Sequence, residues 1–323
     1  MLVDEGIEAY ALHQKRGFRY RWFKSATPVR WTHQLKAGRI RNIKQQIIYW
    51  ITKVKDFSKA TDVPTNPIEV RPKDIVVIPE TKVACVRDIF PGTSKIILNQ
   101  NPFFLFQQSS LENPEQTIYH PDIKGCISMS KWTYSCHRLA QLENTWPASY
   151  FIESKLYRYS NEKKRQIAYM PRRLRKDSTA VINLLRLRGN LQGFTFVPID
   201  GMTQQEVAQA LGESLIFLSF SYREGFGLPP AEAMACGCLV VGYSGNGGDE
   251  FFDEGLAFKI TNGDLASYVE TVEKTIAEYV KNPVELDAYR MRASKYVLET
   301  YSKKASRDLF LTAWNNVTKN MDL

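Results

Sequence analysis

Two glutamates, Glu224 and Glu232, stand eight positions apart around a glycine-rich turn and a Pro-Pro pair. A carboxylate only accepts hydrogen bonds, and it can take both hydroxyls of a vicinal diol. We expect Glu224 in a loop and Glu232 in the first turn of a helix, beside unpaired N–H groups that attract phosphate. This arrangement suits a ligand with phosphates and two sets of hydroxyls, and a nucleotide-sugar is such a ligand.

The surrounding sequence predicts the elements that would position these carboxylates. Apolar runs at 215–220 and 238–243 indicate strands, and a short small-residue helix lies between them. Gly225 and Gly227 permit backbone angles that other residues avoid, and Gly237 suits the end of the helix. Such a unit is typical of a parallel α/β sheet, whose ligands bind outside the carboxyl ends of the strands.

The run EGFGLPPAEAMACG, residues 224–237, resembles the Glu-x7-Glu signature of retaining glycosyltransferases of the family 4 type. The resemblance extends over residues 160–320. It implies the GT-B fold, in which two Rossmann-like, doubly wound α/β domains face each other across a cleft. It also implies transfer of a sugar from a UDP- or GDP-sugar, with UDP-glucose or a close relative as the expected donor. The acceptor would be a polysaccharide, a glycolipid or a lipid-linked molecule.

The resemblance assigns roles to particular residues. Glu224 resembles the first glutamate, which contacts hydroxyls of the donor sugar, and is the catalytic candidate; Glu232 resembles the second, which takes the ribose hydroxyls. A basic turn takes the place of the Arg and Lys that hold the diphosphate in the family. The alternative interpretation is a solvated basic turn with no role in binding. The candidates in this turn are Arg172 or Arg173, with Lys176. The other donor-binding candidates are Val197, Ile199, Phe226, Gly227 and Leu228.

Two further groups at predicted strand ends could contact the sugar or the acceptor. Gly247 and Gly248 offer amides to phosphates or acceptor, and a plain tight turn explains them equally well. Asn99, Gln100 and Asn101 are weaker candidates, because an Asn-Pro turn is the simpler interpretation. The sequence has no Asp-x-Asp pair or histidine cluster beside these positions. We therefore expect no metal and no cofactor. Fixed hydrogen-bond donors and basic side chains would stabilise the leaving diphosphate instead.

The length of 323 residues predicts about two domains. We expect an N-terminal acceptor-side domain over 1–154, a C-terminal nucleotide-sugar domain over 155–304, and a helix over 305–323 that crosses back. The first domain would end with a strand at 148–152. Members of the family open with a strand, a Gly-rich loop and a helix; here that unit is absent, trimmed or built from other residues. This feature favours the alternative function, a non-catalytic nucleotide-sugar-binding module with a regulatory or scaffold role.

Composition limits the class of protein. A content of 44% hydrophobic and 24% charged residues predicts a packed core rather than disorder. No apolar run reaches the roughly 18 residues that span a bilayer, and the N-terminus lacks a signal-peptide pattern. Five cysteines in a chain of this length indicate reduced thiols. We therefore expect a cytoplasmic protein.

The formal net charge of +9 is concentrated near the N-terminus. Residues 1–60 hold thirteen Lys and Arg against four acids, and apolar residues at helical spacing between 40 and 50 predict a basic amphipathic helix. One interpretation is an ordinary helix packed on its own sheet. The other is a surface for an anionic acceptor, such as a lipid-linked diphosphate, or for peripheral association with an anionic membrane at its inner face. No nucleic-acid motif accompanies the charge, so nucleic acid is not an expected partner.

Overall fold

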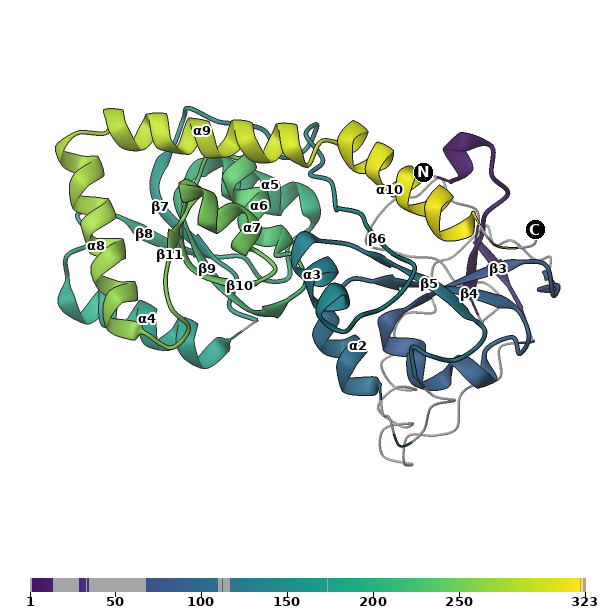
Figure 1. Cartoon of the computed structure of the whole chain (residues 1–323). Helices are drawn as coiled ribbons and strands as arrows, with labels where there is room; N and C mark the ends of the chain where they lie inside the picture. Colours follow the sequence, from purple (N-terminus) through teal and green to yellow (C-terminus); the bar gives the residue numbers. More distant parts are fainter. Residues whose placement is uncertain are drawn as a thin grey trace, which may run out of the picture. The chain divides into compact units, whose positions relative to one another are not determined.

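The computed structural model describes residues 2–13, 29–32, 34, 68–109, 112, 117–172, 174–319 and 321 (Figure 1). The predicted basic amphipathic helix and Arg173 lie outside the described residues. The chain divides into two compact units. One comprises residues 1–98, 104–126 and 317–323, and the other comprises residues 99–103 and 127–316.

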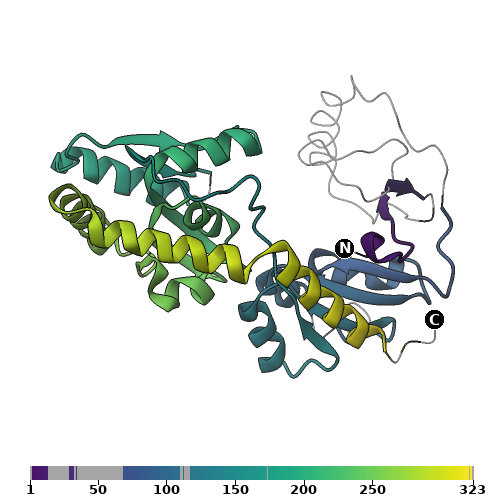
Figure 2. The same ribbon diagram turned by 90° about the horizontal axis from the view of Figure 1, so that it is seen from above.

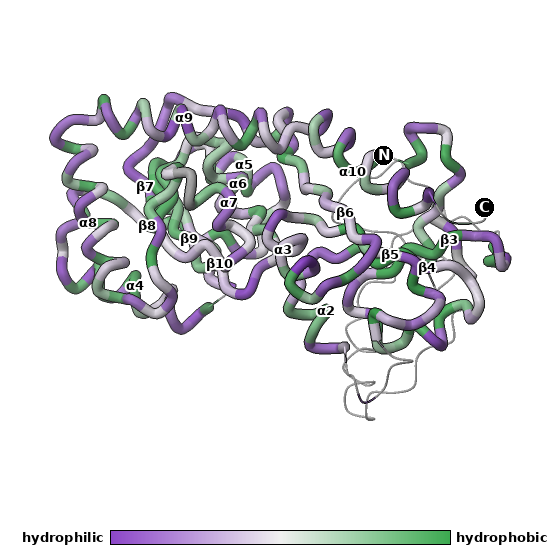
Figure 3. The backbone as a smooth tube through the Cα atoms, viewed as in Figure 1, coloured by the Kyte–Doolittle hydropathy of each residue, from purple (hydrophilic) through white to green (hydrophobic). Residues whose placement is uncertain are grey.

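The larger unit is built on a five-stranded sheet in which every pairing is parallel, with the order β11-β10-β9-β7-β8. Its strands are β7 (Lys164–Tyr169), β8 (Thr195–Pro198), β9 (Ser214–Glu224), β10 (Leu239–Asn246) and β11 (Phe258–Lys259). Near-continuous apolar runs make β9 and β10 buried on both faces, as central parallel strands are (Figure 3).

Helices cover both faces of this sheet (Figure 1). On one face α5 (Gln204–Glu213), α6 (Leu228–Ala235) and α9 (Val284–Thr300) enclose an apolar cluster. On the other face α4 (Arg175–Arg188) and α8 (Leu265–Lys281) pack over a second cluster. The larger unit is therefore a doubly wound parallel α/β sheet, as the sequence predicts.

Shorter elements complete the larger unit. After β10 come α7 (Asp249–Phe251) and a π-helical turn, Phe252–Leu256. At the end of α9 the chain bends and continues into α10 (Lys303–Thr318), as the view from above shows (Figure 2).

A second sheet has the strand order β3-β4-β5-β6. Its strands are β3 (Ile75–Pro79), β4 (Ser94–Asn99), β5 (Ile123–Ser128) and β6 (Thr145–Pro147), and β3 pairs with β4 in parallel. A 3-10 helix (Glu80–Asp88) follows β3, α2 (Pro102–Gln108) follows β4, and α3 (Lys131–Leu139) follows β5. Near the N-terminus a 3-10 turn (Val3–Glu5) precedes β1 (Ala11–His13), which pairs in parallel with β2 (Val29–Trp31).

Several predicted elements are confirmed and one is wrong. The strands predicted at 215–220 and 238–243 correspond to β9 and β10. Thr203 and Glu206 form a capping box at the start of α5. The strand predicted at 148–152 does not form, because β6 ends at Pro147 and the amide of Ile152 donates instead to the carbonyl of Tyr301, at 2.8 Å. The sequence also gave no indication of α2.

No helix in the described ranges combines the length and the apolar character needed to cross a membrane. All five cysteines are among the described residues, and all are free thiols.

Candidate active site

The candidate site lies where three loops of the larger unit meet. Glu224, which we expected in a loop, is the last residue of β9, and the loop between β9 and α6 begins directly after it. The loop after β10 packs against it, and Gly247 N donates to the Glu224 carbonyl at 3.1 Å. The segment after β4 also packs against it, and Asn101 Nδ2 donates to the Arg223 carbonyl at 2.8 Å. The structure thus brings together candidates from three distant stretches of the sequence.

Gly225 is the point at which these loops approach most closely. A Cβ at Gly225 would lie 1.7 Å from the Gln100 carbonyl oxygen, and a Cβ at Gly247 would lie 2.2 Å from the carbonyl carbon of Gly225. Neither glycine has a left-handed φ, whereas Gly227 has a φ of 94°. The conformational freedom expected of Gly225 is therefore not the reason for glycine there; the absence of a side chain is.

The backbone beside these strand ends is strained. Non-glycine residues with left-handed φ stand after β7 (Leu174, 41°), at the end of β9 (Arg223, 51°) and at the end of β10 (Asn246, 75°). Such conformations cost about 1–3 kcal/mol each and persist where surrounding structure enforces them, often at functional sites. Two of these residues, Arg223 and Asn246, lie at the ends of neighbouring strands, and their strain supports placing the site there.

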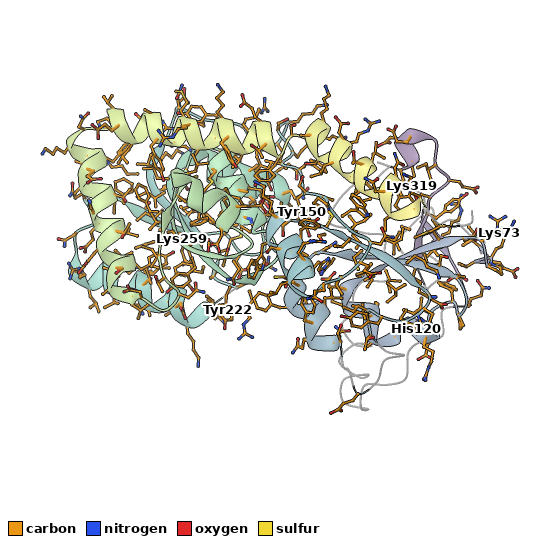
Figure 4. The ribbon with its side chains drawn as sticks, in the orientation of Figure 1. Lys73, His120, Tyr150, Tyr222, Lys259 and Lys319 are labelled. Atoms are coloured by element: carbon orange, nitrogen blue, oxygen red, sulfur yellow. The ribbon has the colours of Figure 1, made fainter. Side chains whose placement is uncertain are left out.

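Exposed groups lie immediately before Glu224. Tyr222 is 40% exposed (Figure 4). The Arg223 guanidinium lies 5.0 Å from the centroid of the Tyr222 ring and 5.8 Å from that of Phe103. Glu224 itself is half-buried. The catalytic candidate therefore follows a cationic and aromatic surface that the motif alone did not indicate.

Glu232 lies further along α6 than the sequence suggests. The helix begins at Leu228, so Glu232 is its fifth residue, just beyond the first turn in which we expected it. Its carboxylate is half-buried and accepts a hydrogen bond from the Tyr157 hydroxyl. Burial raises the pKa of Glu232 to about 7, and the Tyr157 bond opposes that rise. The side chain can accept from hydroxyls, and its charge titrates near neutrality.

The start of α6 offers few amides. Pro229 and Pro230 carry no N–H, and Ala231 N lies 3.5 Å from the Gly227 carbonyl. Gly227 and Leu228 therefore supply the amides at the helix start. Phe226 is buried, and its ring packs 5.0 Å from that of Tyr301, which anchors the loop to the core.

The loop after β10 is held by its own contacts. Gly248 N donates to the Ser244 carbonyl at 3.1 Å, so both glycine amides proposed as ligand donors are used internally. Ser244 Oγ bonds Asp249, and Lys259 Nζ lies 2.8 Å from Asp249 Oδ1 (Figure 4). These contacts favour a structural role for Gly247 and Gly248.

The basic turn follows β7, the neighbour of β9 in the sheet. Arg172 and Lys176 are exposed, and Arg172 Nε lies 3.5 Å from Asp200 Oδ1. An ion pair between two exposed side chains contributes about 0–1 kcal/mol, so a phosphate could readily displace it. The turn follows the carboxyl end of β7, the end of a parallel sheet at which ligands bind.

Val197 in β8 and Ile199 directly after it lie away from the three loops. Strand β8 is an edge strand, separated from β9 by β7. Ile199 packs in the core on the α5–α6 face. Val197 lines a shallow depression of about 210 Å³ together with Met202 and residues of α5. Whether these two side chains contact the base of the nucleotide therefore depends on how far the ligand extends along the carboxyl ends of the strands.

The amides of Asn99 and Asn101 are engaged in hydrogen bonds. Asn101 Oδ1 accepts from Phe103 N at 3.1 Å, which caps α2, and Asn99 Oδ1 accepts from Asn101 N at 3.0 Å. This geometry is the predicted Asn-Pro turn, and Gln100 is its exposed residue. The sequence did not indicate that this turn would lie against the loop between β9 and α6, residues 225–227, which we call the signature loop. No local sequence pattern encodes that contact.

The chain is similar to known glycosyltransferases in sequence. Residues 185–296 match the profile of the family described as "Glycosyl transferases group 1". A curated protein of Actinobacillus pleuropneumoniae serotype 7, named Alpha-1,6-glucosyltransferase, is 28% identical over 262 residues, which cover 74% of this chain and 76% of that protein. Residues 185–296 therefore resemble the group 1 glycosyl transferases, and the chain is a glycosyltransferase that uses a nucleotide-sugar.

Solved structures show the same fold. Sucrose-phosphate synthase from Thermosynechococcus elongatus matches with a TM-score of 0.62 at 12% identity, over 98% of this chain and 91% of that one. Anabaena HepE, solved with UDP and glucose, gives 0.57 at 12% identity, over 89% and 86%. A mutant of S. aureus TarM, solved with Fondaparinux, alpha-GlcNAc-glycerol and UDP, gives 0.54 at 16% identity. That match covers 69% of this chain, which spans about half of the TarM chain, 51%. The fold is GT-B, with two parallel sheets.

The close approach at Gly225 leads to a stability prediction. Gly225→Ala places a methyl against the Gln100 carbonyl, and forcing extra volume into a packed region costs about 1–3 kcal/mol. We expect a lower melting temperature and a loss of activity. The control is Gly212→Ala in α5, where a Cβ has open space and helix propensity favours alanine. A Gly225→Ala protein as stable as the Gly212→Ala protein would contradict the packing described for the three loops.

Proposed function

We propose that this glycosyltransferase moves a hexose, in the first instance glucose, from a UDP-sugar to a carbohydrate or lipid-linked acceptor with retention of anomeric configuration. The observation that carries the proposal is the pair of carboxylates, Glu224 and Glu232, on either side of the glycine-rich start of α6. The glucosyltransferase name of the Actinobacillus relative supports glucose, and the UDP and glucose held by HepE support the donor class.

The donor would extend along the carboxyl edge of the sheet. Glu232 would accept the ribose hydroxyls and Glu224 hydroxyls of the sugar. The diphosphate would lie at the amides of Gly227 and Leu228, with Lys176 and an arginine of the basic turn as counter-charges. Arg172 is exposed in the turn after β7, which supports it as that arginine.

Transfer requires stabilisation of the charge that grows on the departing diphosphate. Fixed amides and cations do this without reorganising during the reaction. The acceptor hydroxyl would attack the anomeric carbon from the face on which the diphosphate leaves, and the departing phosphate oxygen would take its proton. The new glycosidic bond would then keep the configuration of the donor.

The test of this function is turnover without added metal. We expect hydrolysis of UDP-glucose, and transfer once an acceptor is supplied, to continue in EDTA, because the charge is balanced by amides and basic side chains. The anomeric coupling constant in the proton NMR spectrum of the product should show the α configuration of the donor. Activity abolished by EDTA and restored by Mn²⁺, or a β-linked product, would contradict the mechanism.

The raised pKa of Glu232 leads to a prediction about pH. Its folded pKa of about 7 exceeds the unfolded value of 4.5, so ionisation destabilises the free protein as pH rises through that window. Ribose hydroxyls would stabilise the ionised form of Glu232. The contribution of this residue to UDP affinity should therefore increase as the pH rises from 6 to 8. Calorimetry on wild type and Glu232→Gln isolates the effect, because titration of UDP itself is common to both. A wild-type to variant affinity ratio that is constant with pH would argue against ribose binding by Glu232.

The basic N-terminal segment leads to a prediction about the acceptor side. We propose that residues 1–60, with their net charge of +9, meet an anionic acceptor or the membrane that carries it. Each basic residue near an anionic surface contributes about 1 kcal/mol, and salt screens the attraction. Liposomes with anionic lipid should therefore sediment the protein at low salt and release it at high salt, whereas neutral liposomes should not. Equal, poor capture by both liposome types would exclude this role.

A further inference from the structure

The carbonyls on either side of Glu224 are each held by a side chain from outside the signature loop. The Arg223 carbonyl accepts from Asn101 Nδ2 at 2.8 Å, and the Gly225 carbonyl accepts from Ser130 Oγ. Asn101 is 8% exposed and Ser130 is 1% exposed. Two buried side chains therefore donate hydrogen bonds to the backbone carbonyls one residue before and one residue after Glu224.

The side-chain amide of Asn101 has one consistent orientation. Its Oδ1 accepts from Phe103 N at 3.1 Å, so its Nδ2 must face the Arg223 carbonyl. A flipped amide would place two acceptors together at one end and two donors at the other. The cap of α2 and the grip on the signature loop are thus made by opposite ends of one side chain.

The buried side chain of His137 holds the side-chain amide of Asn99, which in turn bonds the backbone of Asn101. Asn99 Oδ1 accepts from Asn101 N, so Asn99 Nδ2 donates to His137 Nε2, 2.6 Å away. The ring proton is therefore on Nδ1, which lies 2.8 Å from the hydroxyls of both Ser128 and Thr145. Burial lowers the pKa of His137 to about 4, so the imidazole is neutral and Nε2 keeps its lone pair.

Ser130 has a second task that also fixes its geometry. Its hydroxyl oxygen accepts from Thr133 N at 3.0 Å and so caps α3. The loop that it grips is strained, because Arg223 adopts a left-handed φ that a residue with a side chain rarely takes. Fixed donors on both flanks supply a physical reason for that conformation to persist.

We infer that Asn101 and Ser130, aligned by Asn99 and His137, are positioning residues that set where the Glu224 carboxylate meets the donor sugar. This inference rests on the proposed function. A shift of about 1 Å at a reacting group can cost about a hundredfold in rate. Binding of the nucleotide, by contrast, depends on Glu232, which lies one turn inside α6 and is not held by these bonds. Loss of the grip should therefore lower kcat and leave UDP affinity unchanged.

The experiment uses Asn101→Asp in the full chain. The carboxylate keeps an acceptor for Phe103 N, so α2 stays capped, but it cannot donate to the Arg223 carbonyl. Asn101→Ser is the uncharged second variant, because its hydroxyl can cap the helix and is too short to reach the loop. Asn282→Asp is the matched control: Asn282 also precedes a proline, and its Oδ1 accepts from the N–H of the second residue along the chain, Val284, at 3.3 Å, in the exposed turn between α8 and α9.

We expect both Asn101 variants to lose about tenfold or more in kcat, with a UDP dissociation constant within about threefold of wild type. Asn282→Asp should leave both quantities unchanged. Unchanged kcat in the Asn101 variants, or a parallel loss of kcat and UDP affinity, would overturn the inference, since a merely structural role predicts one of these results.

A binding measurement separates this inference from the proposed function. The ratio of UDP to UDP-glucose dissociation constants reports contacts with the sugar and needs no turnover. It should change by about tenfold in the Asn101 variants if Glu224 is displaced. A wild type that binds UDP-glucose but neither transfers nor hydrolyses it would refute the proposed function, and the ratio would still decide the positioning role. A wild type that does not bind UDP-glucose would overturn both.

Discussion

The site depends on one steric constraint, the contact of three backbone segments at Gly225. The Gln100 carbonyl and Gly247 approach Gly225 so closely that neither glycine could carry a side chain. The absence of side chains at Gly225 and Gly247 lets the loops after β4, β9 and β10 meet at the carboxyl ends of the strands. The carbonyls of residues 223, 224 and 225 in the β9 loop then accept hydrogen bonds from Asn101, Gly247 and Ser130, respectively. Interiors packed this tightly yield little, which suits a site that must keep its geometry.

The two glutamates differ in their surroundings although one motif contains both. Glu224 ends a central strand and belongs to a strained loop gripped on both flanks. Glu232 belongs to a regular helix, and burial moves its pKa towards neutrality. A fixed carboxylate suits the reacting sugar, whose transition state requires exact placement of charge. A helical acceptor with a titrating charge suits the ribose, which must bind and then leave.

Local pattern predicted the elements and missed the contacts between them. Alternating strand and helix signals located β9, β10 and the short helix between them. The order of strands is not a local property, so the separation of Val197 from the signature loop by β7 was not apparent. The approach of Gln100 to Gly225 joins residues more than a hundred positions apart, and no periodicity encodes it. For the same reason the sequence did not indicate that Ser130 and His137 support the loop that contains Glu224.

The central claim is that the carboxyl edge of the larger unit's sheet is where the donor binds. A crystal structure of the protein soaked with UDP tests it most directly. We expect ribose hydroxyls within hydrogen-bond distance of the Glu232 carboxylate, and a diphosphate at the amides of Gly227 and Leu228 near Lys176. Electron density for UDP at another edge of the sheet, or a ribose that leaves Glu232 bonded only to Tyr157, would contradict it.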